Sequence, residues 1–338
     1  MSPGKTWLTG FFLLAIGGSI GTMGQSDQEA YDVIVIGAGL AGLSAANRIL
    51  DQNPSTSLLV LEARNVSGGR VMSHRMNTPE GPKSIDIGSQ FVSLKHRGIL
   101  DLALQFGLTV EEQPLCGERT VIQGTPQSTV TSAFRRRKRS YTWTSNLGGS
   151  PTIDTVLASS DLDLLASQSC AKFIQSNNLD KSDGDGMKRL LQTFYDAPDT
   201  AVSPLQLLLT ASSEDGTVDD VLAEMGHGAG LRVKEGLAAL IDKLSTRNGL
   251  QTLYNSPVTA ITQVNPSLQS VTVNGKELMA RQVIIAVPPA VASNIDLSPV
   301  LPEKMTNFLR NYRPRGFATY FAMTYAKPFW RENGNSGQ

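Results

Sequence analysis

The chain has 338 residues, with 30 basic and 30 acidic side chains and a formal net charge of zero, so it could hold two domains. This charge balance gives no reason to expect nucleic acid or an anionic membrane surface as a partner. The two cysteines, Cys116 and Cys170, cannot form a disulfide framework, and three scattered histidines predict no metal site. One disulfide bridge and two separate buried thiols are both open interpretations of the cysteines.

The first 24 residues predict a secretory signal peptide. Lys5 supplies a positive charge, Trp7–Ile20 is apolar, and small residues follow, with cleavage expected near Gly24. The apolar stretch is short for a transmembrane helix, and an uncleaved N-terminal anchor is the alternative. We therefore expect a secreted or luminal protein with no other membrane span.

A nucleotide-binding pattern follows at Tyr31. Val33–Ile36 has the composition of a buried parallel strand, and Leu40–Leu50 has the apolar spacing of a helix. Gly37, Gly39 and Gly42 lie between and within them in G-x-G-x-x-G spacing. Such a turn presents the N-terminal N–H groups of a helix to a phosphate, and its glycines allow the tight turn, the approach of a pyrophosphate and the packing of helix on strand.

A second buried strand, Leu58–Leu61, ends at Glu62, 20 positions after Gly42. This is where the dinucleotide motif places an acid for a ribose hydroxyl. A purely structural glycine turn is the alternative, which the agreement of strand, helix and acid disfavours. Glu62 suits either NAD or FAD, but Arg64 and the run Gly68–Arg70 favour FAD, because they add close backbone approach and a fixed cation.

The segments LEARNVSGGRVMS and SIDIGSQFVSLKHRGILDLALQFGL resemble the FAD-dependent amine oxidases, which include monoamine, polyamine and L-amino acid oxidases. The resemblance runs from Tyr31 onward. It implies an α/β fold in which a Rossmann-like FAD-binding domain is interleaved with an α+β substrate domain. The implied segments are 31–92 and 233–297 for the FAD-binding domain, and 93–232 and 298–338 for the substrate domain.

The motif and the resemblance together give a set of expected FAD contacts. These are Gly37, Gly39, Gly42, Glu62, Ala63, Arg64, Gly68, Gly69, Arg70 and Val258. Val258 rests on the resemblance alone, and a buried strand residue is its other interpretation. Asp86–Ser89 passes near the flavin in relatives, but a strand end with a turn glycine explains it equally well.

The middle of the chain predicts strands and then helices. His96–Leu108 is an amphipathic helix that stops at Gly107, and Leu108–Val130 alternates as two or three strands do. Arg135–Arg139 is best explained as a solvated loop, rather than as a nucleic-acid patch or a processing site. Further helices are expected at Ser160–Ser176, Gly186–Ala197 and Ser203–Ala211.

The chain then returns to the cofactor domain. Relatives have two glycines where this chain has Glu235 and Gly236, and a helix follows to Leu244. Leu253–Val258 matches a family strand, and Asn274-Gly275 predicts a hairpin. Three more elements are expected: a buried parallel strand at Gln282–Val287, a helix at Leu301–Leu309 and a strand at Arg315–Tyr325.

The resemblance implies oxidation of a small-molecule amine to an imine, then an aldehyde, with oxygen as co-substrate and hydrogen peroxide released. It places a lysine near flavin N5 where this chain has Tyr320, so no catalytic residue is assigned. Relatives continue past Gln338, which implies that the C-terminal part is missing, as an incomplete gene product or a natural short form. An L-amino acid or polyamine oxidase, and a truncated non-catalytic form, are the alternatives.

Overall fold

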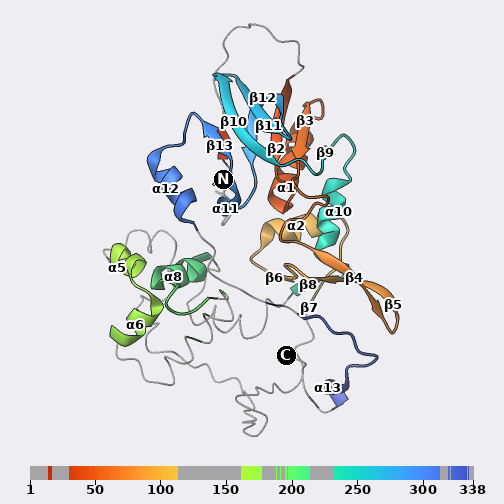
Figure 1. Ribbon diagram of the computed structural model, residues 1–338. Coiled ribbons are helices and arrows are strands. Elements are labelled where there is room, and N and C mark those ends of the chain that lie inside the picture. Colours follow the sequence, from red (N-terminus) through yellow and green to blue (C-terminus); the bar gives the residue numbers. More distant parts are fainter. Residues whose placement is uncertain are drawn as a thin grey trace, which may run out of the picture.

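The computed structural model (Figure 1) describes residues 14–16, 30–112, 161–176, 197–213, 231–312 and 321–332, with residues 188, 191, 195, 319 and 334. Cys116, Arg135–Arg139 and Tyr320 lie outside these residues, and so does nearly all of the expected signal peptide.

The largest sheet has eight strands in the order β13-β10-β11-β12-β2-β3-β9, with β1 paired to β12 off this path (Figure 1). Its strands are β1 (Leu14–Ile16), β2 (Tyr31–Ile36), β3 (Leu58–Leu61), β9 (Gln251–Leu253), β10 (Val258–Asn265), β11 (Leu268–Val273), β12 (Lys276–Ile285) and β13 (Asp296–Ser298). Strands β12, β2, β3 and β9 are parallel neighbours, which confirms the expected α/β fold.

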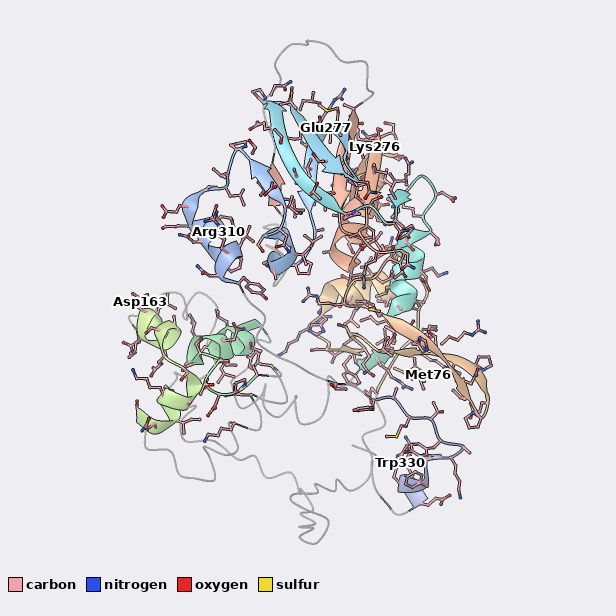
Figure 2. The ribbon with its side chains drawn as sticks, viewed as in Figure 1. Met76, Asp163, Lys276, Glu277, Arg310 and Trp330 are labelled. Atoms are coloured by element: carbon pink, nitrogen blue, oxygen red, sulfur yellow. The ribbon has the colours of Figure 1, made fainter. Side chains whose placement is uncertain are left out.

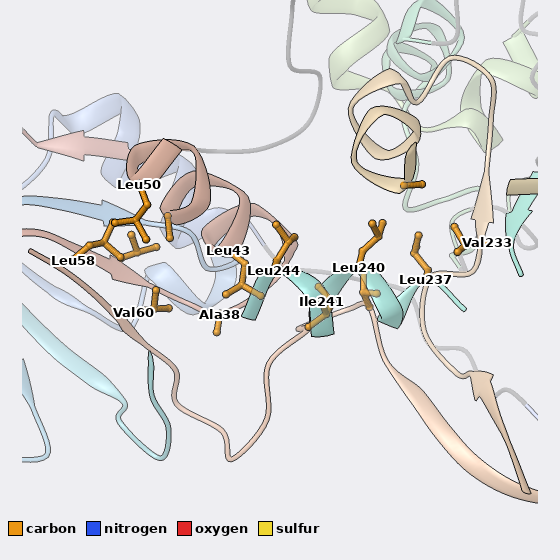
Figure 3. Close-up of a cluster of buried hydrophobic side chains, with 14 of the residues drawn as sticks. Ala38, Leu43, Leu50, Leu58, Val60, Val233, Leu237, Leu240, Ile241 and Leu244 are labelled. Atoms are coloured by element: carbon orange, nitrogen blue, oxygen red, sulfur yellow. The ribbon is translucent and has the colours of Figure 1, made fainter. Parts of the chain in front are cut away.

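Both faces of the parallel strands β2 and β3 are buried. On β2, Val33 and Val35 belong to one apolar cluster, while Ile34 and Ile36 belong to another on the opposite face. The first cluster contains α1 (Leu40–Gln52) and α10 (Ala238–Ser245), whose packed side chains are drawn in Figure 3. Because side chains alternate between faces along a strand, two covered faces explain the uninterrupted apolar run in the sequence.

Strand β12 corrects two of the sequence predictions. The hairpin predicted at Asn274-Gly275 and the strand predicted at Gln282–Val287 were expected as separate elements, but one continuous strand serves both. Its first half pairs antiparallel with β11 and its second half pairs parallel with β2. The turn before it is as predicted, since Asn274 and Gly275 have φ values of +50° and +73°. Lys276 and Glu277, labelled in Figure 2, begin the strand.

Strand β1 lies inside the expected signal peptide. Leu14, Ala15 and Ile16 pair antiparallel with Ile285, Ile284 and Val283 of β12. These residues of β12 pair with β2 on their other edge. In this structure the N-terminal segment therefore supplies a strand of the main sheet.

Two smaller sheets and a helix follow β3. The hairpin of β4 (Ser73–Thr78) and β5 (Gly81–Asp86) forms one sheet. The other joins β6 (Phe91–Val92), β8 (Leu231–Val233) and β7 (Val110–Glu112). Helix α2 (Arg97–Gln105) is followed by Gly107 at φ +67°, which confirms the predicted helix stop. β7 is the described part of the predicted strands after Leu108.

Three helices form a separate apolar cluster (Figure 1): α5 (Leu162–Ser167), α6 (Cys170–Ser176) and α8 (Pro204–Ser213). The single helix expected over Ser160–Ser176 is wrong, because Gln168 is extended and the Ser169 hydroxyl accepts a hydrogen bond from Lys172 N–H at 3.2 Å. Cys170 is a free, buried thiol. Burial, aided by the charge of Asp199, raises its pKa to about 12, so it is inert at neutral pH.

Three further helices lie in the described C-terminal part: α11 (Pro289–Ala292), α12 (Glu303–Asn311) and α13 (Phe329–Glu332). The strand expected at Arg315–Tyr325 is not formed by residues 321–325, the described part of that range apart from residue 319. Among the described helices, none has the length and hydropathy needed to cross a bilayer.

Replacing Leu240 by alanine is expected to lower the free energy of unfolding by about 2–5 kcal/mol, because Leu240 is fully buried in the cluster that joins α1 and α10. Leu104 on α2 is the matched control, since it is 73% exposed and its replacement by alanine should cost less than about 1 kcal/mol. Urea unfolding followed by circular dichroism measures both. Equal losses at the two positions would contradict the burial of Leu240.

Candidate nucleotide-binding site

The turn from β2 into α1 is a close-packed glycine turn. Gly37 has φ +103°, a conformation that favours glycine, and its N–H donates to Leu61 O at 2.8 Å. A Cβ atom on Gly42 would lie 1.9 Å from Gly37 O and 3.2 Å from Ala286 Cβ, so no side chain fits there. The first and third glycines of the motif therefore have the structural roles that the spacing predicts.

Gly39 differs from its two partners in having space beside it. A Cβ atom on Gly39 would meet a single neighbour, Gly68 O at 3.9 Å. Gly39 also begins α1 without a side-chain cap, and the first helical bond runs from Leu43 N–H to Gly39 O. The three N–H groups before Leu43 thus have no acceptor within the helix. This uncapped end of a 13-residue helix offers N–H donors and a positive dipole end to a phosphate.

The carboxylate of Glu62 connects the ends of β2 and β3. Its Oε2 accepts the N–H of Ala38 at 2.8 Å, and its Oε1 accepts the N–H of Arg64 at 2.9 Å. Glu62 is 7% exposed, so these donors compensate for the burial of its charge. Each carboxylate oxygen can accept more than one hydrogen bond, so Glu62 still has capacity for a ribose hydroxyl.

The loop after Glu62 folds back onto the glycine turn. Gly68 N–H donates to Ala38 O at 2.9 Å, and Gly68 forms a parallel bridge with Gly39. Gly68 has φ +121°, and a Cβ atom there would lie 2.3 Å from Val71 O. The Arg64 guanidinium reaches back to Gly69 O at 3.3 Å and so joins the two ends of this loop.

A second loop, between β9 and β10, lies beside the first. Glu62 N–H donates to Leu253 O at 2.9 Å, and Ser256 N–H donates to Glu62 O at 2.8 Å. Asn255, at φ +51°, turns the chain between them. The single strand expected over Leu253–Val258 is therefore wrong, because this turn separates β9 from β10. Val258 begins β10 and packs partly buried against the second apolar cluster.

Asp86 links this region to α10. Its Oδ2 accepts the N–H of Leu237 at 2.8 Å, at the start of α10. Gly88 lies against the glycine-arginine segment, since a Cβ atom there would be 2.2 Å from Arg70 O. Ser89 N–H also donates to Arg70 O at 3.0 Å. The segment 86–89 thus packs against Arg70 and helps to hold the end of the nucleotide loop in place.

Glu235, at a position where the family resemblance implies a glycine, has a structural role of its own. Its carboxylate accepts the N–H of Thr109 at 3.0 Å, next to the bond from Lys234 N–H to Thr109 O. Burial of Glu235 alone would raise its pKa, but the N–H groups of Thr109 and of Glu235 itself, with the charge of Lys234, hold that pKa below its ordinary value. The left-handed conformation is found at Gly236, φ +89°, so position 235 tolerates a side chain.

The structure brings most of the expected cofactor residues together. Gly37, Gly39, Gly42, Glu62, Arg64, Gly68 and Gly69 form one connected network around the start of α1. Ala63 and Arg70 are exposed on the same loop. Sequence reasoning missed Ser67, Tyr254 and Ser256. Tyr254 bonds to Ser67, and Ser256 N–H donates to Glu62 O, each across more than 180 residues of chain and without a local motif. In the described part of the chain, no three His, Cys, Asp or Glu side chains cluster as metal ligands would.

Comparison with known proteins identifies the family. The profile for flavin containing amine oxidoreductase matches residues 40–338. This chain belongs to that family. It is 26% identical to flavin-containing amine oxidase B of Cavia porcellus over 318 residues, which cover 90% of this chain and 59% of that enzyme. It is also 26% identical to an L-amino acid dehydrogenase of Synechocystis, over 93% of this chain and 67% of the relative.

Solved structures agree on the fold. Putrescine oxidase bound to putrescine matches with a TM-score of 0.71 at 22% identity, over 91% of this chain and 69% of that one. Cyclohexylamine oxidase from Brevibacterium oxydans matches with a TM-score of 0.69 at 24% identity, over 83% and 63%. The chain thus spans about six to seven tenths of the relatives it matches.

The family's cofactor is FAD, and the site fits its nucleotide half. The open space beside Gly39 and the uncapped start of α1 suit a pyrophosphate. The buried carboxylate of Glu62 lies 20 positions further on, where it can accept from a ribose hydroxyl. Packing within the chain explains why positions 37 and 42 must be glycine. It does not explain Gly39, which has open space beside it where a ligand would fit.

Gly42→Ala is expected to abolish FAD retention and to destabilise the protein, because the new methyl group would overlap Gly37 O. Gly98→Ala is the matched control on α2, where a Cβ atom meets nothing within 4 Å. Alanine there should raise the free energy of unfolding slightly, by less than about 1 kcal/mol, because it favours a helix more than glycine does. Absorbance at 450 nm after gel filtration with FAD, and urea unfolding, measure both variants. Normal flavin retention by Gly42→Ala would contradict the close packing.

Glu62→Gln is expected to weaken ADP binding about tenfold or more, because one of the two N–H donors would face an amide NH₂ group and the charged acceptor would be lost. Glu112→Gln on the exposed end of β7 is the control and should bind ADP normally. Titration calorimetry measures both affinities. An unchanged affinity in Glu62→Gln would show that the carboxylate does not contribute to the nucleotide site.

Proposed function

We propose that this chain is the nucleotide-binding part of an FAD-dependent enzyme that oxidises a small amine to an imine, with oxygen as the electron acceptor and hydrogen peroxide as a product. The observation that carries the proposal is the junction of β2, α1 and β3. There an uncapped helix end and the buried Glu62 carboxylate lie on one connected loop network. Membership of the flavin-containing amine oxidoreductases supplies the reaction class.

Different residues of this chain would bind different parts of the dinucleotide. The N–H groups at the start of α1 would bind the pyrophosphate, and Glu62 would accept from the ribose. Arg64 and Arg70 add positive charge on the adjoining loop, where both side chains are exposed. Val258 would contact the adenine from the start of β10.

Bound FAD supplies the acceptor for a hydride equivalent from the amine's α-carbon, and the imine product hydrolyses to an aldehyde. The part assigned to this chain's residues is binding and orientation. The backbone on either side of these free N–H groups is held by its own hydrogen bonds, from Gly37 N–H to Leu61 O and from Leu43 N–H to Gly39 O, so little ordering is needed on binding. No described side chain is assigned to proton transfer.

The substrate is proposed by class alone. Relatives are named for monoamines, putrescine, cyclohexylamine and L-amino acids, all of which present an amine on an oxidisable carbon. The pattern of Met1–Gly24 supports secretion or a luminal location as part of this proposal.

The full-length chain is expected to retain a visible flavin band after mixing with FAD and gel filtration. Anaerobic addition of benzylamine, putrescine or an L-amino acid should bleach that band in at least one case, and a peroxidase-coupled assay in air should detect hydrogen peroxide. The Gly42→Ala variant serves as the control without cofactor. A retained flavin that none of these amines bleaches would overturn the proposed oxidation while leaving cofactor binding intact.

A further inference from the structure

The two loops at the nucleotide site are connected by one pair of side chains. Ser67 lies on the loop after β3 and Tyr254 on the loop between β9 and β10, and their hydroxyl oxygens are 2.9 Å apart. The other bonds between these loops join main-chain atoms, as in the bond from Asn255 N–H to Arg64 O at 2.9 Å. Among the described residues, this is the only hydrogen bond between a side chain of one loop and a side chain of the other.

Ser67 has a position that affects the nucleotide turn directly. The next residue, Gly68, donates to Ala38 O and bridges to Gly39. A hydrogen bond that restrains Ser67 therefore also restrains the segment that faces the start of α1. Within the loop itself, Arg64 N–H donates to the Glu62 carboxylate at 2.9 Å near its start, and the Arg64 guanidinium makes a longer bond to Gly69 O at 3.3 Å near its end.

Tyr254 is not placed there by burial. It is 39% exposed and belongs to none of the apolar clusters. The loop around it is held by separate bonds, including Ser256 Oγ to Tyr254 O at 3.0 Å and Asn274 Nδ2 to Asn255 O at 3.0 Å. A rigid loop that ends in an exposed phenol can hold the hydroxyl of Ser67 in one position.

We propose that the hydrogen bond between Tyr254 and Ser67 positions the loop 62–70 for the dinucleotide, so that these two side chains help to set the affinity for the ADP half of FAD. This inference rests on the assignment of FAD to the site. Tyr254 and Ser67 act as positioning residues, through Gly68 and Gly69, and need not touch the cofactor themselves. The effect on affinity should be that of one neutral hydrogen bond, about three- to tenfold.

The test is a double-mutant cycle on the full-length chain, with the dissociation constant for ADP measured by titration calorimetry. Tyr254→Phe and Ser67→Ala should each weaken ADP binding about three- to tenfold, and the double variant should be no weaker than either single one. Ser67→Thr keeps the hydroxyl and should bind like the wild type. Urea midpoints should stay the same, because neither hydroxyl is part of the core.

The control is Tyr325→Phe, which removes the hydroxyl of another half-exposed tyrosine, bonded to Met323 Sδ rather than to the nucleotide loops. Its affinity for ADP should equal that of the wild type. Wild-type affinity in Tyr254→Phe, or effects of the two single changes that add fully, would overturn the proposal. A wild-type chain that binds neither ADP nor FAD would overturn the cofactor assignment and this proposal with it.

Discussion

The nucleotide site depends on one buried carboxylate at the carboxyl end of two parallel strands. Glu62 binds the N–H of Ala38 at the end of β2 and the N–H of Arg64 in the loop after β3. A buried charge is costly unless it is hydrogen-bonded, so this residue sets the path of both loops around it. The glycine turn and the loop 62–70 therefore form one unit, and the same carboxylate that organises them is available to a ribose.

The surrounding sheet holds this unit in a fixed position at its edge. Apolar side chains cover both faces of β2 and β3, so their main-chain ends are held in place with little freedom. The segment just after β12 adds a wall, because Ala286 and Val287 lie against Gly37. Ligands of open α/β sheets bind outside the carboxyl ends of the strands, and here the helix dipole, the free N–H groups and the acid converge at that edge.

The sequence predicted the parts of the site that are local. Strand, glycine turn, helix and Glu62 lie within about 30 residues, and each has its own spacing or composition signal. The turn at Asn274-Gly275 and the stop at Gly107 were predictable for the same reason, since each needs a left-handed backbone. The continuous β12 was missed because its two halves have different neighbours and hence different patterns. The contact of Ser67 with Tyr254 was out of reach, because tertiary folding alone brings these residues together.

Strand β1 lies in the segment for which the sequence predicts a signal peptide. Leu14–Ile16 pairs with the last three residues of β12, immediately before the wall behind Gly37. The predicted cleavage near Gly24 would remove β1, and would leave one edge of Val283–Ile285 to water or to another strand. The predicted leader and the sheet would then need the same few residues. The order in which cleavage and folding occur would decide what covers this edge.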